Sequence, residues 1–195
     1  MQQISEIKSF ADFHSVPIMK DEGIEFICDY IRNHKVERVL EIGTAIGFSS
    51  INFARVAPQV QVTTIELDET RYQTAVRNIA DNNLSDRITC YLGDAGTWTP
   101  PQGESYELIF IDGPKAQYIN HFERFAPFLT PGGAIITDNL SFHGMVEDLS
   151  LTHNYSTIKM MRKIRRFINF LKQNKDFDTT FYDIGDRISV SLRRS

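Results

Sequence analysis

The stretch LIFIDGPK, Leu108 to Lys115, has an apolar run that ends in an aspartate, and a lysine follows three residues later. A second run, AIITDNL, is also apolar and ends in Asp138 and Asn139. Uninterrupted apolar character is typical of strands that are buried on both faces of a parallel sheet. We therefore predict two core strands that both deliver oxygen-bearing side chains at their carboxyl ends.

The rest of the chain alternates between helical and strand patterns, as in a parallel sheet with helices on both faces. Helical periodicity covers 21–35, 47–56, 69–81, 117–128 and 156–174. Strand patterns cover 39–42, 61–66, 87–94, 108–111 and 134–137, with a turn expected at 131–133. The segment 177–194 alternates on two arms around Gly185 and Asp186, which predicts a terminal antiparallel hairpin. The resulting class is α/β.

The composition sets limits on the class of protein. A chain of 195 residues with 42% hydrophobic residues suits one domain, 1–195, with a substantial core. The net charge of −4 gives no overall attraction to nucleic acid or to an anionic membrane. Cys28 and Cys90 match no metal or redox spacing, and no run is long enough to span a bilayer. We expect a cytoplasmic protein with reduced thiols.

The loop after the first strand, LEIGTAIG, suggests a cofactor site. Gly43 and Gly47 permit a tight turn and a close ligand, but their spacing is not the G-x-G-x-x-G of dinucleotide-binding proteins. Glu41 would repel a pyrophosphate and would suit a cationic group such as the amino group of S-adenosylmethionine. Glu66 ends the second strand, where an acid commonly binds ribose hydroxyls. Asp94 is expected on the adenine side, although a simple turn aspartate is nearly as good an explanation.

Asp112, Asp138 and Asn139 should meet at the carboxyl edge of the sheet. Clustered carboxylates raise one another's pKa, so a bound cation is the natural resolution. Oxygen ligands alone favour Mg²⁺, Mn²⁺ or Ca²⁺ over zinc. Lys115 lies near enough in sequence to reach a substrate, and beside a cation it would release its proton more readily and act as a general base. The alternative explanations are that Lys115 is an ordinary surface lysine and that Asp138 and Asn139 are a polar pair in a turn. The histidines show no metal-ligand spacing and are expected to be structural or surface residues, and His143 is the nearest of them to this cluster in sequence.

With these residues placed, the sequence resembles the cation-dependent O-methyltransferases of the catechol and caffeoyl-CoA type. The motifs VLEIGTAIGFSS, TTIELDE, GDA, FIDGPKAQY and TDNL carry the likeness. The resemblance implies a Rossmann-like class I methyltransferase fold with a mostly parallel seven-stranded sheet. It implies S-adenosylmethionine with Mg²⁺ or Mn²⁺ as cofactors, Lys115 as the base, and a homodimer. The implied metal ligands are Asp112, Asp138 and Asn139. The implied cofactor contacts are Ile18, Glu41, Gly43, Gly47, Ser49, Glu66, Asp94, Ala95 and Asp112, with Ser49 at the cofactor carboxylate.

The last third of the chain is most similar to a bacterial branch that methylates 5-hydroxyuridine at the wobble position of tRNA. The predicted helix 156–174, with the Lys175 that follows it, contains seven basic residues and no acid, which favours contact with phosphates. The same pattern also fits the solvated face of an amphipathic helix. Two alternatives stay open: a small catechol-like acceptor, and a non-catalytic module that binds the cofactor or RNA. The presence of the whole metal set and of Lys115 counts against the second.

Overall fold

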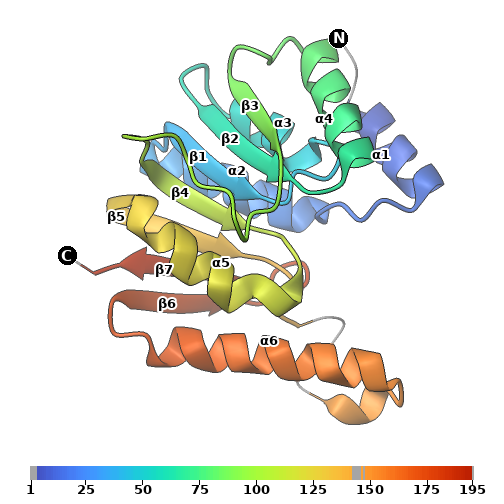
Figure 1. Cartoon of the computed structure of the whole chain (residues 1–195), viewed down its shortest axis with the longest axis vertical. Coiled ribbons are helices and arrows are strands. Elements are labelled where there is room, and N and C mark those ends of the chain that lie inside the picture. The colour runs from blue at the N-terminus through green and yellow to red at the C-terminus, as the bar shows by residue number, and fades with distance from the viewer. Residues whose placement is uncertain (1–3, 142–145, 147, 195) are drawn as a thin grey trace.

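The computed structural model describes residues 4–141, 146 and 148–194. One seven-stranded sheet, in the order β3-β2-β1-β4-β5-β7-β6, runs through the molecule (Figure 1). Its strands are β1 (Arg38–Ile42), β2 (Gln61–Glu66), β3 (Ile88–Leu92), β4 (Tyr106–Ile111), β5 (Leu129–Thr137), β6 (Phe177–Tyr182) and β7 (Ile188–Arg193). The pairs from β3 to β5 are parallel, and β7 pairs antiparallel with both β5 and β6. The predicted sheet with its terminal hairpin is confirmed.

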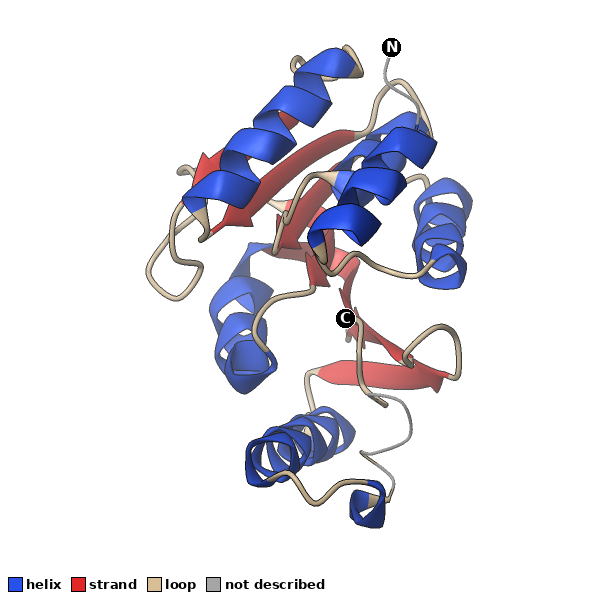
Figure 2. Ribbon diagram, turned by 90° about the vertical axis from the view of Figure 1, so that its right-hand side faces the viewer, coloured by secondary structure: helices blue, strands red, loops and turns tan. Residues whose placement is uncertain are grey.

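Helices cover both faces of the sheet (Figure 2). They are α1 (Ile4–His14), α2 (Asp21–His34), α3 (Phe48–Arg55), α4 (Glu69–Asp81), α5 (Tyr118–Phe125) and α6 (Tyr155–Gln173). Short 3₁₀ turns are η1 (Lys115–Gln117), η2 (Ala126–Phe128) and η3 (Leu149–Leu151). Two buried clusters result, one containing side chains of α1, α2 and α3 and the other containing those of α5 and α6.

Strand β4 shows why this sheet needs cover on both sides. Leu108 and Phe110 point into the first cluster, and Ile109 and Ile111 point into the second. All four side chains are 0% exposed. Because side chains alternate across a strand, a continuous apolar run must be buried on both faces.

Three local expectations differ from the structure. Helix α1 was not expected, because only Ile7 and Ala11 of its length are buried and the apolar pattern is short. Strand β5 begins at Leu129 and includes the Pro131–Gly133 segment that was expected to be a turn. Its register with β4 shifts between Tyr106 and Leu108, so an irregular stretch is held inside the ladder. The helix expected over 117–128 is a shorter α5 with a 3₁₀ turn at each end.

Parallel order brings the carboxyl ends of β1, β2, β3, β4 and β5 to one edge of the sheet. Glu66 ends β2, Asp112 follows β4 directly, and Asp138 follows β5 directly. Ligands of open α/β sheets bind at this edge. Within the described residues, no helix combines the length and the apolar character that a bilayer span requires.

Candidate active site

The ends of β1 and β4 approach each other so closely that only glycine fits at position 43. Gly43 has φ +102°, and a Cβ atom there would lie 2.4 Å from the main-chain oxygen of Asp112. Asp112, the residue that follows β4, is also held by its backbone, because its N–H donates to the Ile42 carbonyl at 2.9 Å. The glycine therefore places the turn after β1 directly beside Asp112.

Glu41 is a buried acceptor below this turn. Its carboxylate is 0% exposed and accepts hydrogen bonds from the hydroxyls of Ser49, Ser50 and Thr64, the last at 2.6 Å. Burial raises the pKa of Glu41, and the three hydroxyl donors oppose that rise. The contacts fasten the first turn of α3 to β1 and β2. A carboxylate offers about four acceptor positions, and three are used here, so the predicted contact with an amino group would also require this fully buried carboxylate to become accessible.

Ser49, predicted to contact the cofactor carboxylate, gives its hydroxyl to Glu41. The N-cap residue of α3 is Gly47, which has φ +84° and no side chain to cap the helix. The N–H groups of an uncapped first helical turn are suited to an anionic group. Any contact between Ser49 and a cofactor carboxylate would therefore use the Ser49 backbone amide more readily than its hydroxyl.

Glu66 ties the two loops of this edge together. One carboxylate oxygen accepts from the Ala45 N–H at 2.7 Å, and the other accepts from the Asp68 N–H at 2.9 Å. Each oxygen keeps a second lone pair, so the predicted contacts to ribose hydroxyls stay available. Glu66 is 7% exposed.

Asp94 borders a cavity of about 420 Å³ that α5 and the loop after β3 enclose. His121 of α5 also lines this cavity, although it was expected to be structural or superficial. The imidazole is 3% exposed, and its Nδ1 atom has no hydrogen-bond partner in the described part of the chain. Burial lowers the pKa of His121, which keeps the ring neutral. A polar residue on the buried face that Tyr118, Phe122 and Phe125 form was the signal that sequence analysis overlooked.

The predicted metal ligands do meet. The Asn139 amide donates from Nδ2 to Asp112 Oδ1 at 3.1 Å and to Asp138 Oδ2 at 3.2 Å. Asn139 has φ +64°, a left-handed conformation that asparagine tolerates well, and it turns the side chain back towards β4. Asp138 is 4% exposed, and its Oδ1 atom has no hydrogen-bond partner among the residues that the structure describes.

Both carboxyl groups hold their protons more tightly than usual. Burial, together with the nearby Asp138, raises the pKa of Asp112 to about 8, against the opposing charge of Lys115. Burial raises the pKa of Asp138 to about 6, while the Asn139 N–H and the cations Lys115 and Lys20 oppose the rise. The buried Asp138 Oδ1, which lacks a partner among the described residues, and two carboxyl groups with raised pKa values fit a site for a hard divalent cation. Rotating the Asn139 amide by 180° would turn its Oδ1 towards the carboxylates of Asp112 and Asp138.

Lys115 begins η1, directly after the Asp112 turn, and its side chain is half-buried. Tyr118 lies one turn further on, and its hydroxyl donates to the Asp138 main-chain oxygen at 3.1 Å. This bond links the start of α5 to the end of β5. It fixes the segment with Lys115 relative to the metal cluster.

The remaining predicted residues lie at the margin of this group or outside it. Ile18 is half-buried and packs against the first core cluster. Ala95 is half-buried and packs against the second. His143 lies outside the described residues. Among those described, no group of three or more His, Cys, Asp or Glu side chains could hold a metal, so the cluster of two aspartates and one asparagine is the candidate.

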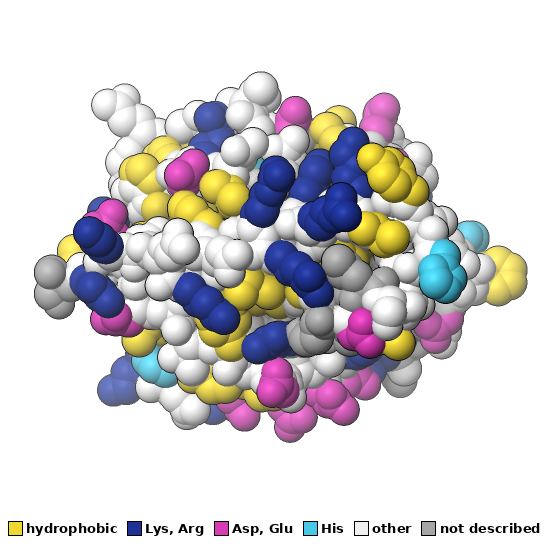
Figure 3. Space-filling view, turned by 90° about the horizontal axis from the view of Figure 1, so that it is seen from below, with side chains coloured by type: hydrophobic (Ala, Val, Ile, Leu, Met, Phe, Trp, Pro, Cys, Tyr) yellow, Lys and Arg dark blue, Asp and Glu magenta, His cyan; other side chains and the backbone are white. Residues whose placement is uncertain are grey.

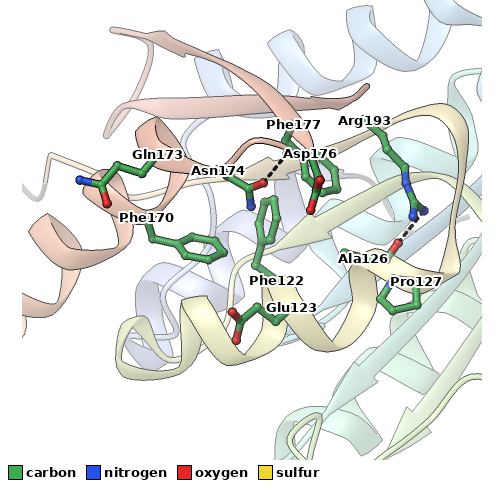
Figure 4. Close-up of a pocket in the computed structure, with 10 residues that line it drawn as sticks. All are labelled: Phe122, Glu123, Ala126, Pro127, Phe170, Gln173, Asn174, Asp176, Phe177 and Arg193. Atoms are coloured by element: carbon green, nitrogen blue, oxygen red, sulfur yellow. Dashed lines mark hydrogen bonds between the residues drawn. The ribbon is translucent and has the colours of Figure 1, made fainter. Parts of the chain in front are cut away.

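A second cavity, of about 470 Å³, lies at the other edge of the sheet (Figure 4). Phe122, Phe170 and Phe177 form its aromatic side, and Arg193 donates to the Ala126 and Leu129 carbonyls. It borders the start of β5, whereas Asp138 follows the end of that strand. None of the predicted site residues lines it.

Comparison with known proteins now connects this geometry to a family. A profile of the O-methyltransferase family matches residues 1–194. The chain belongs to the O-methyltransferase family. The predicted enzyme class, an S-adenosylmethionine-dependent O-methyltransferase, is confirmed, as is the Rossmann-like methyltransferase fold.

Individual relatives agree with this membership. A catechol O-methyltransferase of Mycobacterium tuberculosis is 29% identical over 157 residues, which are 77% of this chain and 71% of that protein. A caffeoyl-CoA O-methyltransferase of Populus kitakamiensis is 23% identical over 197 residues, with 95% and 82% covered. A solved structure from Staphylococcus aureus, assigned provisionally to the caffeoyl-CoA O-methyltransferases, superposes with a TM-score of 0.94 at 33% identity. That match covers 100% of this chain and 93% of the other.

Proposed function

We propose that this O-methyltransferase uses a divalent cation to methylate one of two neighbouring oxygens on a planar acceptor. We further propose that the acceptor is 5-hydroxyuridine at the wobble position of tRNA. The observation that carries the metal proposal is the junction of Asp112, Asp138 and Asn139 beside Lys115. It lies at the same sheet edge as the Gly43–Gly47 turn and Glu66, where we place S-adenosylmethionine.

Asp112, Asp138 and Asn139 would hold the ion, with Mg²⁺ or Mn²⁺ favoured by the oxygen donors. When bound, the ion acidifies an acceptor hydroxyl that it coordinates, and S-adenosylmethionine supplies an electrophilic methyl group. Burial of Asp138 excludes water from the inner side of the cluster. The Asn139 amide bridges the two carboxylates through its two hydrogen bonds, which keeps all three side chains at one place.

Lys115 is the residue that we assign to proton removal from the acceptor hydroxyl. It starts a 3₁₀ turn whose position is fixed by the Gln117 N–H bond to Pro114 O at 2.8 Å and by the Tyr118 hydroxyl. A general base must be positioned before its proton affinity matters. Glu66 would orient the ribose, and Asp94 with Ala95 would border the adenine beside the His121 cavity.

The case for tRNA rests on the surface of α6. This helix packs against η1, which carries Lys115. Lysine and arginine side chains gather on the face of the molecule where α6 lies (Figure 3). The exposed members are Lys159, Arg162, Arg166, Lys172 and, just beyond the helix, Lys175. A basic strip beside a catalytic site is suited to phosphates.

A catechol-like acceptor is the second candidate, because the named relatives include catechol and caffeoyl-CoA O-methyltransferases. Catechol and 5-hydroxyuracil both present two adjacent oxygens, so the metal cluster alone does not choose between them. We also keep the homodimer as a proposal, which light scattering of the purified protein would test.

The metal proposal has a direct test. Chelation with EDTA should abolish methyl transfer, and Mg²⁺ or Mn²⁺ should restore it. Asp138→Ala should remove turnover while keeping most of the affinity for S-adenosylmethionine, measured by calorimetry. Asp112→Ala should affect both, because Asp112 also borders the cofactor turn. Full activity in chelator would refute the role of the ion.

For the acceptor, the purified enzyme should be given tRNA that contains 5-hydroxyuridine and, separately, a simple catechol. Nucleoside analysis by mass spectrometry reads the first reaction. Methylation of catechol with no reaction on the tRNA would favour the small-molecule candidate.

A further inference from the structure

An ion pair joins two segments that lie far apart in the sequence. Lys20 precedes α2, and Asp186 lies at the tip of the β6-β7 hairpin. Lys20 Nζ is 2.7 Å from Asp186 Oδ1, with side-chain exposures of 50% and 18%. The tip also lies close to the start of α2, since a Cβ atom added at Gly185 would lie 3.9 Å from the Gly23 nitrogen. The N-terminal segment therefore braces the hairpin tip.

The same tip holds the backbone that leaves the metal cluster. The Leu140 N–H donates to the Arg187 carbonyl at 3.0 Å, and the Ser141 N–H donates to the Asp186 carbonyl at 2.9 Å. These bonds follow Asp138 and Asn139 directly in the chain. Asn139 and Arg187 both have left-handed backbone, with φ +64° and +68°. The direction of the Asn139 side chain thus depends on the tip staying in place.

The charges of the pair also reach the cluster. The backbone bonds from Leu140 and Ser141 to the hairpin tip place Asp186 close behind the segment that carries Asp138. Asp186 without Lys20 would be a third negative group beside Asp112 and Asp138. Because like charges repel, the tip would then tend to move away from the cluster.

We propose that Lys20 and Asp186 are positioning residues, whose ion pair holds the hairpin tip so that Asp138 and Asn139 face the divalent cation. The inference rests on the metal site of the proposed function. Neither residue belongs to the site that the sequence predicted, because nothing in a linear pattern relates positions 20, 138 and 186. The pair contributes to geometry, and it does not touch the reacting atoms.

Binding of Mn²⁺ alone, followed by electron paramagnetic resonance, tests this inference without turnover. Removing a positive charge near a cation site should tighten binding if Lys20 acts only through its field. Positioning predicts the opposite sign, so Lys20→Met should weaken Mn²⁺ binding by about 10-fold or more. Asp186→Asn should weaken it similarly, and the double variant should be little worse than either single variant, because both changes break one contact. Lys20→Arg should restore most of the affinity.

Lys8→Met is the matched control, because Lys8 also makes an N-terminal ion pair, with Asp21, but carries no part of the hairpin contact. It should leave Mn²⁺ binding unchanged. Thermal melting of every variant separates lost binding from lost folding. Mn²⁺ affinity in Lys20→Met that equals or exceeds the wild-type value overturns the inference and leaves the metal site intact. A wild-type protein that binds no Mn²⁺ overturns the metal site, and the inference with it.

Discussion

The absence of one Cβ atom decides how closely the ends of β1 and β4 approach each other. At Gly43 the missing Cβ atom leaves room for the Asp112 carbonyl, and the backbone is left-handed as well. Gly103 offers a matched comparison, since its φ is +89° but an added Cβ atom would meet nothing within 4 Å. The two glycines therefore separate backbone strain from steric conflict.

We predict that Gly103→Ala lowers the free energy of unfolding by about 1–2 kcal/mol, the cost of left-handed backbone alone. Gly43→Ala should cost clearly more, because the alanine methyl group and the Asp112 carbonyl cannot both keep their places. It should also weaken binding of S-adenosylmethionine, whereas Gly103→Ala should not. Urea denaturation and calorimetry give the two readouts. Equal losses of stability at both positions would show that the close approach contributes nothing.

The cysteines provide a second prediction for individual residues. Burial raises the pKa of Cys28 to about 11 and that of Cys90 to about 12. At pH 8 roughly one thiol in a thousand or fewer would then be ionised, and only the thiolate reacts. The folded protein should react slowly with Ellman's reagent at pH 8, and the reaction should accelerate as the pH rises towards 11. Protein unfolded in urea should release two equivalents of the reagent's chromophore quickly, since exposed thiols titrate near 8.5.

Among the secondary-structure elements, α6 has one buried face that packs in the core and one exposed face that is basic. Phe167 is 1% exposed and meets the rings of Tyr118 and Phe122 at centroid distances of 5.2 and 6.2 Å. Its neighbour Arg166 is exposed. Asn154 caps the helix, because its side chain accepts from the Ser156 and Thr157 N–H groups. Both interpretations of the helical pattern, an amphipathic core helix and a basic surface, thus find residues to support them.

Phe167→Ala should lower the free energy of unfolding by about 3–5 kcal/mol, because it leaves a cavity between α5 and α6. Arg166→Gln, one position earlier, should change stability by no more than about 0.5 kcal/mol. Urea denaturation measures both. A large loss in Arg166→Gln would mean that the basic face has a structural role that its exposure does not suggest.

The elements also show what could be predicted from sequence. Strands β1, β2 and β4 and helix α4 follow the expected bounds closely, because their patterns are strong and local. The whole span of β5 could not be predicted, since Pro131 and Gly132 are typical turn residues and lie in the strand only because the pairs Tyr106–Leu129 and Leu108–Ala134 flank them. Helix α1 buries too few side chains to give a clear period. Long-range pairing, not local preference, decides these cases.

For the site, the sequence placed Asp112, Asp138, Asn139 and Lys115 correctly at one sheet edge, because parallel topology brings strand ends together. It did not reveal that Glu41 is surrounded by three hydroxyls, or that the Lys20–Asp186 pair lies close by. Those contacts depend on how α3 and the hairpin tip dock. Docking of this kind is set by three-dimensional packing, which no residue spacing expresses.

For the whole molecule, the question is how an acidic protein could attract RNA. The net charge of −4 repels a polyanion at long range, so any attraction must be local to the α6 face. At physiological ionic strength the Debye length is about 8 Å, and a basic strip then acts without much opposition from distant acids. Arg165 should be left out of any test of this strip, because it donates to the Val146 carbonyl and so supports the fold.

We predict that tRNA binding weakens steeply with salt, whereas binding of a neutral catechol hardly changes. Replacing Lys159, Arg162 and Arg166 with glutamine should raise the Michaelis constant for tRNA and leave catechol turnover unchanged. If each side chain neutralises one phosphate, the slope of log affinity against log salt should fall by about 2, at roughly 0.7 per contact for single-stranded RNA. Lys115→Met should instead lower the rate on both acceptors, because proton removal is common to both. A salt slope near zero in the wild-type enzyme would separate α6 from substrate recognition and favour the small acceptor.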